Sequence, residues 1–374
     1  MKICIVAGAR PNFIKVAPLV RAIEQQKARH QQSSMPPTVD YDLIYTGNEQ
    51  DPTLESQLFE NLGIARPTTF LGVDSTNLNE LTGLVMAKFE LYLKSHPTNV
   101  VVVVDDLAST MAVSIVTKKQ GITLAHIAAG TRSFDITMPK EINRLVIDGL
   151  SDLLFTAGIS NNSIANKEGA ELSKVYMVGN ILIDNLRFNH KHMVQAQLPT
   201  DIQALVTRPY LVFTLNRKAL LANKENLLCM LSQLIAVTGD TPIIAPLRAQ
   251  AMETIAALGL HQGLNLSHFH IIPSLGYLEF GHLAAGAKGI ITDSGNVAEE
   301  ATFYQVPCIT LNNYTEHIET VKVGTNVLVG EDAAQLTAAT KDMLNGHWKK
   351  GHIPDRWDGR SGERILQILI EHCQ

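Results

Sequence analysis

The sequence lacks the features that mark membrane-spanning, disulfide-bonded and secreted proteins. It contains no run of about 18 consecutive apolar residues, so we expect no transmembrane helix. The apolar segment that follows Met1 is too short for a signal peptide. The cysteines form no C-x-x-C pair, which is typical of thiols in a reducing compartment; they are Cys4, Cys229, Cys308 and Cys373. These absences predict a cytoplasmic protein without membrane insertion.

Neither sign of charge dominates, and metal-ligand patterns are missing. The chain has 31 Lys and Arg against 36 Asp and Glu, a net charge of −5, so it has no basic footprint for nucleic acid. No G-x-S-x-G, Walker or zinc motif occurs. The closest histidines are only i, i+2 apart: we expect His190 and His192 in a surface loop, and His268 and His270 in or before a strand. We therefore expect no metal and no cofactor.

Short β-branched runs alternate with longer amphipathic stretches in the first half of the chain. Most runs are continuously apolar, as parallel strands covered on both faces are. The expected strands are Ile3–Ala7, Tyr41–Tyr45, Val100–Val104, Thr123–Ile127 and Leu153–Thr156. The expected helices are Phe13–Gln26, Leu54–Leu62, Leu78–Lys94, Thr110–Gln120 and Ser160–Glu168. This alternation predicts a doubly wound α/β sheet.

The same alternation resumes after a break at Gly179–Thr200. The expected strands are Tyr210–Thr214, Pro242–Ala245, Phe269–Ile272, Gly289–Thr292 and Cys308–Leu311. The expected helices are Lys224–Val237, Met252–Leu258, Tyr277–Ala285, Gly295–Tyr304 and Ala333–Asn345, with a last helix at Glu363–Cys373. A polar insert at Ala28–Thr38 is expected to be a surface loop. Two such units in tandem predict one cleft at the carboxyl ends of both sheets, where ligands bind.

Two strand-to-helix turns have residues suited to an anion. In the first, Gly8 permits a sharp turn, and Arg10 and Lys15 lie near a helix N-terminus, where negative charge is favoured. In the second, Ser294 and Gly295 open a helix and would offer a hydroxyl and backbone N–H groups to a diphosphate. The alternatives are a plain turn with two surface cations and an ordinary capped helix start.

Three segments carry a resemblance to a known family. Val100–Thr110, His126–Asp135 and Met138–Arg144 closely resemble the UDP-N-acetylglucosamine 2-epimerases of the non-hydrolysing type, and the resemblance extends over nearly the whole chain. It implies a GT-B type fold, in which two doubly wound Rossmann-like domains face one cleft and the terminal helix returns to the first domain. The implied domains are residues 1–180 with 355–374, and residues 181–354.

The resemblance also implies a ligand and the residues that hold it. The ligand is UDP or a UDP-N-acetylhexosamine, in bacterial surface-polysaccharide sugar metabolism, and a homodimer or a heterodimer with an active relative is expected. Glu300 corresponds to the family glutamate that holds the ribose hydroxyls, and Asp106 to a family carboxylate at the cleft. The expected substrate-binding residues are Arg10, Lys15, Arg132, Asn143, Arg144, Arg248, Ser294, Gly295 and Glu300.

Several ionisable residues of the family pattern are replaced. Ala128 and Lys140 stand where the family has glutamates, and Asn216 where it has a histidine. The family reaction is thought to remove the C2 proton and expel UDP, so it needs a positioned base on each face of the sugar. None of these three side chains is a base at neutral pH. Conventional 2-epimerisation is therefore not expected, and Asp106, with Asp105 and Glu141 as further candidates, is left for catalysis.

Asp105 stands where the family has glycine. If it points into the cleft with Asp106, the two carboxylates repel each other and a diphosphate; the alternatives are that it faces solvent or caps the helix near Ser109. Asn312 and His317 replace family arginines, while Arg248 replaces a histidine.

The segment Thr46–Glu49 matches a family loop that helps to bind a second, activating nucleotide sugar. The loop lacks the family's Gln and His, so this regulation is not expected here. Three functions stay open for the chain as a whole: a family enzyme with altered chemistry, a catalytically silent partner or regulatory subunit, and a scaffold without a nucleotide site.

Overall fold

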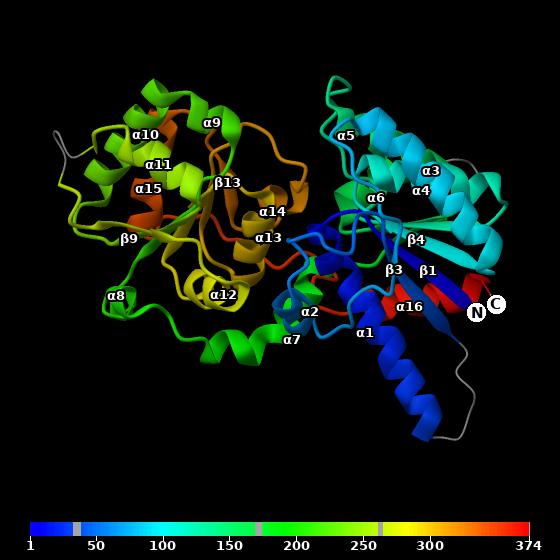
Figure 1. Cartoon of the computed structure of the whole chain (residues 1–374). Coiled ribbons are helices and arrows are strands. Elements are labelled where there is room, and N and C mark those ends of the chain that lie inside the picture. Colours follow the sequence, from blue (N-terminus) through cyan, green and yellow to red (C-terminus); the bar gives the residue numbers. More distant parts are fainter. Residues whose placement is uncertain (33–38, 169–173, 261–264, 374) are drawn as a thin grey trace. The chain divides into compact units, whose positions relative to one another are not determined.

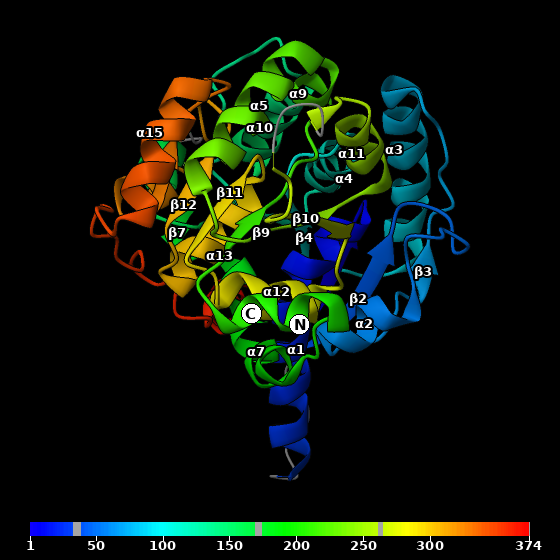
Figure 2. The ribbon, with the colours of Figure 1, turned by 90° about the vertical axis from the view of Figure 1, so that its left-hand side faces the viewer.

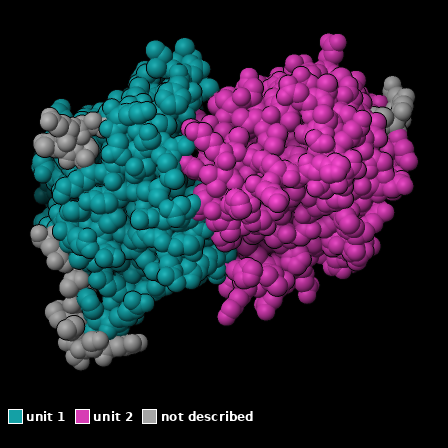
Figure 3. Space-filling model, turned by 180° about the vertical axis from the view of Figure 1, so that it is seen from behind, with its two compact units in different colours: residues 1–188, 355–374 teal, residues 189–354 magenta. Residues whose placement is uncertain are grey.

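The computed structural model describes residues 1–32, 39–168, 174–260 and 265–373, and divides into two compact units (Figure 3). Unit 1 contains residues 1–188 and 355–374, and unit 2 contains residues 189–354. The division falls inside helix α7 (Ile181–Gln195), slightly later than the residue 180 expected from the sequence. The start of this helix belongs to unit 1, because Ile181 packs into the core of that unit.

Unit 1 is built on one parallel sheet of seven strands in the order β3-β2-β1-β4-β5-β6-β7 (Figure 1). Residues on alternate sides of the strands enter two different cores: Ile3 and Ile5 pack on one side, and Cys4 and Val6 on the other. Both faces of the sheet are therefore covered. The strands are β1 (Lys2–Ala7), β2 (Asp40–Tyr45), β3 (Thr69–Phe70), β4 (Val100–Val104), β5 (Thr123–Ile127), β6 (Leu153–Thr156) and β7 (Lys174–Met177).

Helices cover the two faces of this sheet. The core with Ile3 also receives α1 and α16, and the core with Cys4 receives α3 and α4. Besides α7, the helices are α1 (Arg10–Gln32), α2 (Ser56–Leu62), α3 (Leu78–Ser95), α4 (Ala108–Lys119), α5 (Pro139–Leu150), α6 (Ile159–Glu168) and α16 (Ser361–Cys373). The last turns of α1 extend beyond the sheet (Figures 1 and 2). The doubly wound architecture expected from the sequence is confirmed for this unit.

The terminal helix α16 is fixed to unit 1 by its N-terminus and its apolar face. Asp184 accepts hydrogen bonds from the backbone N–H groups of Ser361, at 3.1 Å, and Gly362, at 2.8 Å, which satisfies helix donors that lack intrahelical partners. Gly362 lies so close to the backbone of Pro18 in α1 that a Cβ would not fit there. A larger residue at this position would separate α16 from α1.

Unit 2 repeats the design with six parallel strands in the order β10-β9-β8-β11-β12-β13. The strands are β8 (Leu211–Phe213), β9 (Ile243–Leu247), β10 (Phe269–Pro273), β11 (Gly289–Thr292), β12 (Cys308–Thr310) and β13 (Asn326–Leu328). The helices are α8 (Thr200–Gln203), α9 (Lys218–Ala222), α10 (Lys224–Thr238), α11 (Ala249–Ala256), α12 (Tyr277–Ala285), α13 (Gly295–Tyr304), α14 (Ile318–Lys322) and α15 (Ala333–Leu344). No helix among the described residues is long and apolar enough to cross a membrane.

Some local expectations were wrong. His190 and His192 lie in helix α7 rather than in a loop, because apolar residues at helical spacing, including Leu186 and Met193, bury one side of that segment. The expected loop Ala28–Thr38 is helical up to Gln32 as the end of α1, and residues 33–38 lie outside the described part of the chain. The strands β3, β7 and β13 and the helix α5 were not expected.

Candidate functional site

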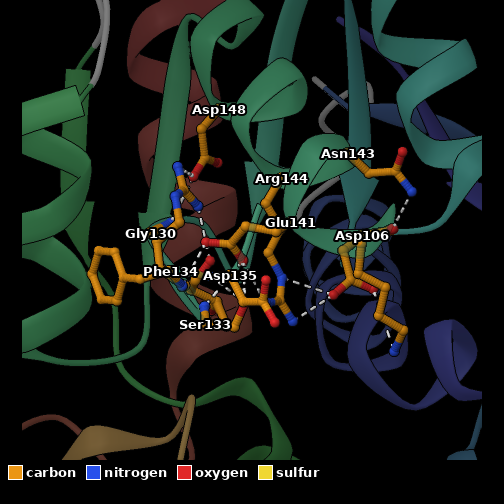
Figure 4. A network of polar contacts seen from close by, with 12 residues as sticks. Asp106, Gly130, Ser133, Phe134, Asp135, Glu141, Asn143, Arg144 and Asp148 are labelled. Atoms are coloured by element: carbon orange, nitrogen blue, oxygen red, sulfur yellow. Dashed lines mark hydrogen bonds and ion pairs between the residues drawn. The ribbon is translucent and has the colours of Figure 1, made fainter. Parts of the chain in front are cut away.

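In unit 1, helix α5 contributes charged side chains to a buried network at the carboxyl end of the sheet (Figure 4). Arg144 is at its centre. Its Nε and Nη2 lie 2.8 and 2.6 Å from Oδ2 of Asp106, and its Nη1 lies 3.0 Å from Oε2 of Glu141. Asn143 donates a hydrogen bond of 2.8 Å to the backbone carbonyl of Asp106. Three residues expected in the site, Asp106, Asn143 and Arg144, are thus brought together.

Glu141 uses both carboxylate oxygens to hold the segment that follows β5. It accepts hydrogen bonds from the backbone N–H groups of Ser133, at 3.0 Å, and Phe134, at 2.9 Å, and from the Ser133 hydroxyl at 3.0 Å. Burial works against ionisation, but these donors and Arg144 hold the pKa of Glu141 below its usual range. A carboxylate that is this well stabilised as an anion suits positioning rather than proton abstraction.

A second part of the network surrounds Asp148. This buried carboxylate lies 2.6 Å from Nδ1 of His126 and 2.8 Å from Nη2 of Arg132, and accepts a 3.0 Å hydrogen bond from the backbone N–H of Gly130. Burial disfavours its charged form, yet His126 and Arg132 hold the pKa of Asp148 below its usual range. Sequence reasoning missed His126 and Asp148; the only signal was a carboxylate on the face of α5 that also carries Arg144.

Arg132 was expected to bind substrate, and in unit 1 it is buried between carboxylates. Besides Asp148, its Nε donates a 2.8 Å hydrogen bond to Glu168 of α6, and its Nη1 donates to the backbone carbonyl of Thr131. The side chain is 2% exposed. Its contacts connect the segment after β5 to α5 and α6, and so fix the backbone from which the rest of the network projects.

Asp106 has a second cation nearby. Nζ of Lys140, on the exposed side of the first turn of α5, lies 3.9 Å from its Oδ1, while Oδ2 receives both donors of Arg144. Proton abstraction by Oδ2 would require the Arg144 pair to open. The retained carboxylate is therefore held mainly as a partner of α5.

Asp105 points away from Asp106 and toward helix α1. Its Oδ1 lies 2.5 Å from Nζ of Lys15, and its Oδ2 accepts a 3.0 Å hydrogen bond from the Asn12 amide. The alternatives of a solvent-facing residue and of a helix cap are both wrong, because the side chain is 18% exposed and Leu107 is the N-cap of α4. Since each of the two neighbouring carboxylates has its own cation, the expected mutual repulsion is offset.

The turn between β1 and α1 uses its own backbone donors. The N–H groups of Gly8 and Ala9 donate to Oδ1 of Asn12, at 2.9 and 3.1 Å. Arg10 is exposed at the start of α1. Of the two expected anion-binding cations, Lys15 is thus paired with Asp105, whereas Arg10 faces solvent.

In unit 2, the start of α13 has the features expected of a nucleotide-binding turn. Ser294 is the N-cap, and its hydroxyl accepts from the Val297 N–H at 3.5 Å. The preceding Asp293 accepts from the backbone N–H groups of Asn216, at 2.7 Å, and Arg217, at 2.5 Å, and so joins the ends of β8 and β11. Gly295 lies against the ring of His317, which leaves no room for a Cβ.

Glu300 and Glu299 differ in their surroundings although they are adjacent. Oε1 of Glu299 lies 2.8 Å from Nδ1 of His317. Desolvation, reinforced by the neighbouring Glu299, raises the pKa of Glu300 to about 8. A raised pKa favours the protonated carboxyl group, which can both donate a hydrogen bond to a hydroxyl and accept one from it.

Other residues around the sheet edge of unit 2 are exposed or paired with each other. Asn216 is exposed, and Arg248 is the exposed N-cap of α11. The guanidinium of Arg217 contacts the side chains of Asn312 and Glu331. The described residues contain no group of three or more His, Cys, Asp or Glu that could hold a metal ion.

A pocket of about 460 Å³ lies in unit 1 beside the Thr46–Glu49 loop. It is lined by Thr46, Gly47 and Asn48 of this loop and by the carboxylate residues Asp51 and Asp74. No lysine, arginine or histidine is among the described residues that line it. Two carboxylates without a cation disfavour a diphosphate at this pocket.

Comparison with known proteins gives consistent matches over the length of the chain. The family model described as UDP-N-acetylglucosamine 2-epimerase matches residues 31–370. A UDP-N-acetylglucosamine 2-epimerase of Methanocaldococcus jannaschii is 34% identical over 99% of both chains. A UDP-2,3-diacetamido-2,3-dideoxy-D-glucuronate 2-epimerase of Pseudomonas aeruginosa is 31% identical over 92% of both.

A solved structure extends this likeness to three dimensions. The crystal structure of the Methanocaldococcus jannaschii UDP-GlcNAc 2-epimerase in complex with UDP-GlcNAc and UDP is 34% identical to the chain, with a TM-score of 0.79. The match covers 99% of this chain and 100% of the chain in that crystal structure.

Proposed function

Since the chain belongs to the UDP-N-acetylglucosamine 2-epimerase family, we propose that it binds a UDP-hexosamine and that the start of α13 holds the nucleotide. The observation that carries this proposal is the turn itself. Ser294 and Gly295 follow a buried strand and open a helix, which favours an anion at this N-terminus. Glu300, with its pKa raised to about 8, lies on the same helix and suits ribose hydroxyls as donor and acceptor.

We further propose that conventional 2-epimerisation is weak or absent. Ala128 and Asn216 have no titrating group, and Lys140 is 66% exposed and lies 3.9 Å from Asp106. Of the three remaining candidates, Asp106 and Glu141 contact Arg144, and Asp105 contacts Lys15. General acid–base groups typically contribute about 10²–10⁴-fold each, so the loss of several leaves little turnover even when binding persists.

Calorimetric titration with UDP and with UDP-N-acetylglucosamine tests the binding proposal. Ser294→Ala removes the N-cap hydroxyl at the start of α13, and we expect it to weaken UDP by about 1 kcal/mol, the scale of one hydrogen bond. Ser267→Ala, which removes an exposed hydroxyl elsewhere in unit 2, is the matched control and should leave affinity unchanged. Absence of both heat and thermal shift at millimolar UDP would favour a scaffold without a nucleotide site.

A second candidate function is that of a catalytically silent partner subunit. It is favoured by the exposed apolar side chains of α5, Ile142 at 45% and Leu145 at 40%, on the helix whose other side carries the charged network. Such a surface fits association with another copy or with an active relative. Light scattering of the chain alone and mixed with an active relative distinguishes these outcomes: a stable heterodimer that alters the relative's turnover supports a partner role, and a monomer in both cases contradicts it.

A further inference from the structure

We propose that Asp105 is a resident anion: its carboxylate occupies the cationic turn after β1 and opposes the binding of a phosphate group there. The proposal goes beyond the proposed function, because it concerns any phosphate group that approaches this turn. It concerns a residue that determines affinity and takes no part in chemistry.

The first support is that both oxygens of Asp105 are directed at this turn. Oδ1 lies 2.5 Å from Nζ of Lys15, and Oδ2 accepts from the Asn12 amide at 3.0 Å. The two charged side chains are 17% and 18% exposed, so the pair is only partly screened by water. An anion that approaches Lys15 therefore meets a carboxylate already in place.

The second support is that two backbone donors of the turn are connected to the same carboxylate through Asn12. The N–H groups of Gly8 and Ala9 donate to Oδ1 of Asn12, and the amide nitrogen of Asn12 donates to Asp105. A phosphate usually takes such N–H groups at a helix N-terminus directly. Here they are satisfied internally, and Asp105 fixes the orientation of the Asn12 amide that satisfies them.

The third support is the backbone at Asp105. Its φ is 58°, in the left-handed region that disfavours most side chains, although aspartate tolerates it better than most. The residue is fixed there by its side-chain contacts and by Nε2 of His126, which lies 3.0 Å from its carbonyl oxygen. Glycine at position 105 would remove both the unfavourable backbone conformation and the negative charge.

The test is titration of the full chain with UDP and with inorganic pyrophosphate. We expect Asp105→Asn and Asp105→Gly to bind both ligands about tenfold more tightly than the unchanged chain, on the scale of one charge-assisted contact. Gln305→Gly is the matched control, because Gln305 also has a φ of 58° but lies in unit 2, and it should leave affinity unchanged. Equal affinity of the unchanged chain and of both Asp105 variants would overturn the proposal and leave the proposed function intact.

A second measurement tests the contact between Asp105 and Lys15 without a nucleotide. The acylation rate of each lysine is followed by mass spectrometry at limiting reagent. Lys15 should react several-fold faster in Asp105→Gly than in the unchanged chain, since acylation needs the neutral amine and the carboxylate no longer favours the ammonium form. Lys27, which lies 2.7 Å from Asp40, is the internal control and should not change. If no variant binds UDP, the proposed function fails. In that case an unchanged acylation rate of Lys15 also overturns the proposal for Asp105, and an increased rate supports it.

Discussion

Helices α5 and α13 both bury polar or charged side chains, but they arrange them differently. The buried residues of α13 are Ala298, Glu299, Ala301 and Thr302, and Ser294 caps its N-terminus. The inner side of α5 carries Glu141, Arg144 and Asp148, while Ile142 and Leu145 are exposed. The helix in unit 2 thus begins at a capped N-terminus, whereas the charged groups of the helix in unit 1 mostly satisfy one another.

This difference separates binding from catalysis. A nucleotide needs donors and hydroxyl partners, and these are the roles that we propose for the start of α13 and for Glu300. Proton transfer needs a carboxylate or imidazole whose lone pair can reach the substrate. In unit 1, Asp105, Asp106 and Glu141 are each held by a cation.

The largest expected effect comes from restoring the titratable side chains at positions 128, 140 and 216. The combined variant Ala128→Glu, Lys140→Glu, Asn216→His and Asp105→Gly should raise C2 epimerisation at least about 100-fold over the unchanged chain, because each acid–base group is worth about 10²–10⁴-fold. Single replacements should fail, since such groups act as a unit. Turnover of UDP-N-acetylglucosamine is followed by proton NMR. A combined variant that folds and binds UDP but stays inactive would show that the α5 network, rather than the missing bases, limits the chemistry.

The next largest effect concerns stability. Arg132→Ala should destabilise unit 1 by about 3–5 kcal/mol, because it leaves the buried Asp148 carboxylate without a main partner. Urea unfolding followed by circular dichroism measures this. Arg248→Ala removes an exposed arginine in unit 2 and should cost less than about 0.5 kcal/mol. Equal losses for the two variants would contradict the contrast between a buried network and an exposed binding edge.

The smallest effect is the pH dependence that Glu300 gives to unit 2. Its pKa is raised from 4.5 to about 8 by desolvation and by Glu299, so the folded state keeps a proton that the unfolded state releases. Stability should therefore be highest at low pH with respect to this group, fall on the order of 1–3 kcal/mol as the pH rises from about 5 to about 8, and level off above that. Unfolding of Glu300→Gln at several pH values should lack this component. An unchanged pH profile in Glu300→Gln would show that the carboxyl group is better solvated than its surroundings indicate.

The sequence predicted the sheets well because their strands are continuously apolar. The five valines of β4 are all buried, and no competing pattern obscures them. The edge strands β3 and β13 contain only two and three residues, too few for a period to be recognised. Helix α5 was missed for another reason: its buried side is charged, so its hydrophobic pattern marks the exposed side.

The candidate site was predictable where the type of a residue alone specifies its role. It was unpredictable where the role depends on the residues that the side chain contacts in the fold. The capped start of α13 follows from Ser294 and Gly295 being placed directly after a buried strand. That Asp105 turns toward Lys15 follows from a left-handed backbone, which no spacing rule reveals. The burial of Arg132 depends on Glu168, distant in sequence and brought close only by the fold.

Deuterium exchange at C2 tests the separation of binding from catalysis most directly. The full chain is incubated with UDP-N-acetylglucosamine in D₂O, and proton NMR follows both the C2 proton and ligand line broadening, with the Methanocaldococcus jannaschii epimerase as the active control. We predict broadening of the ligand signals, which reports binding, with no C2 exchange above background. Rapid exchange and formation of the 2-epimer would contradict the account, and would mean that Asp106, Asp105 or Glu141 carries out the proton transfers.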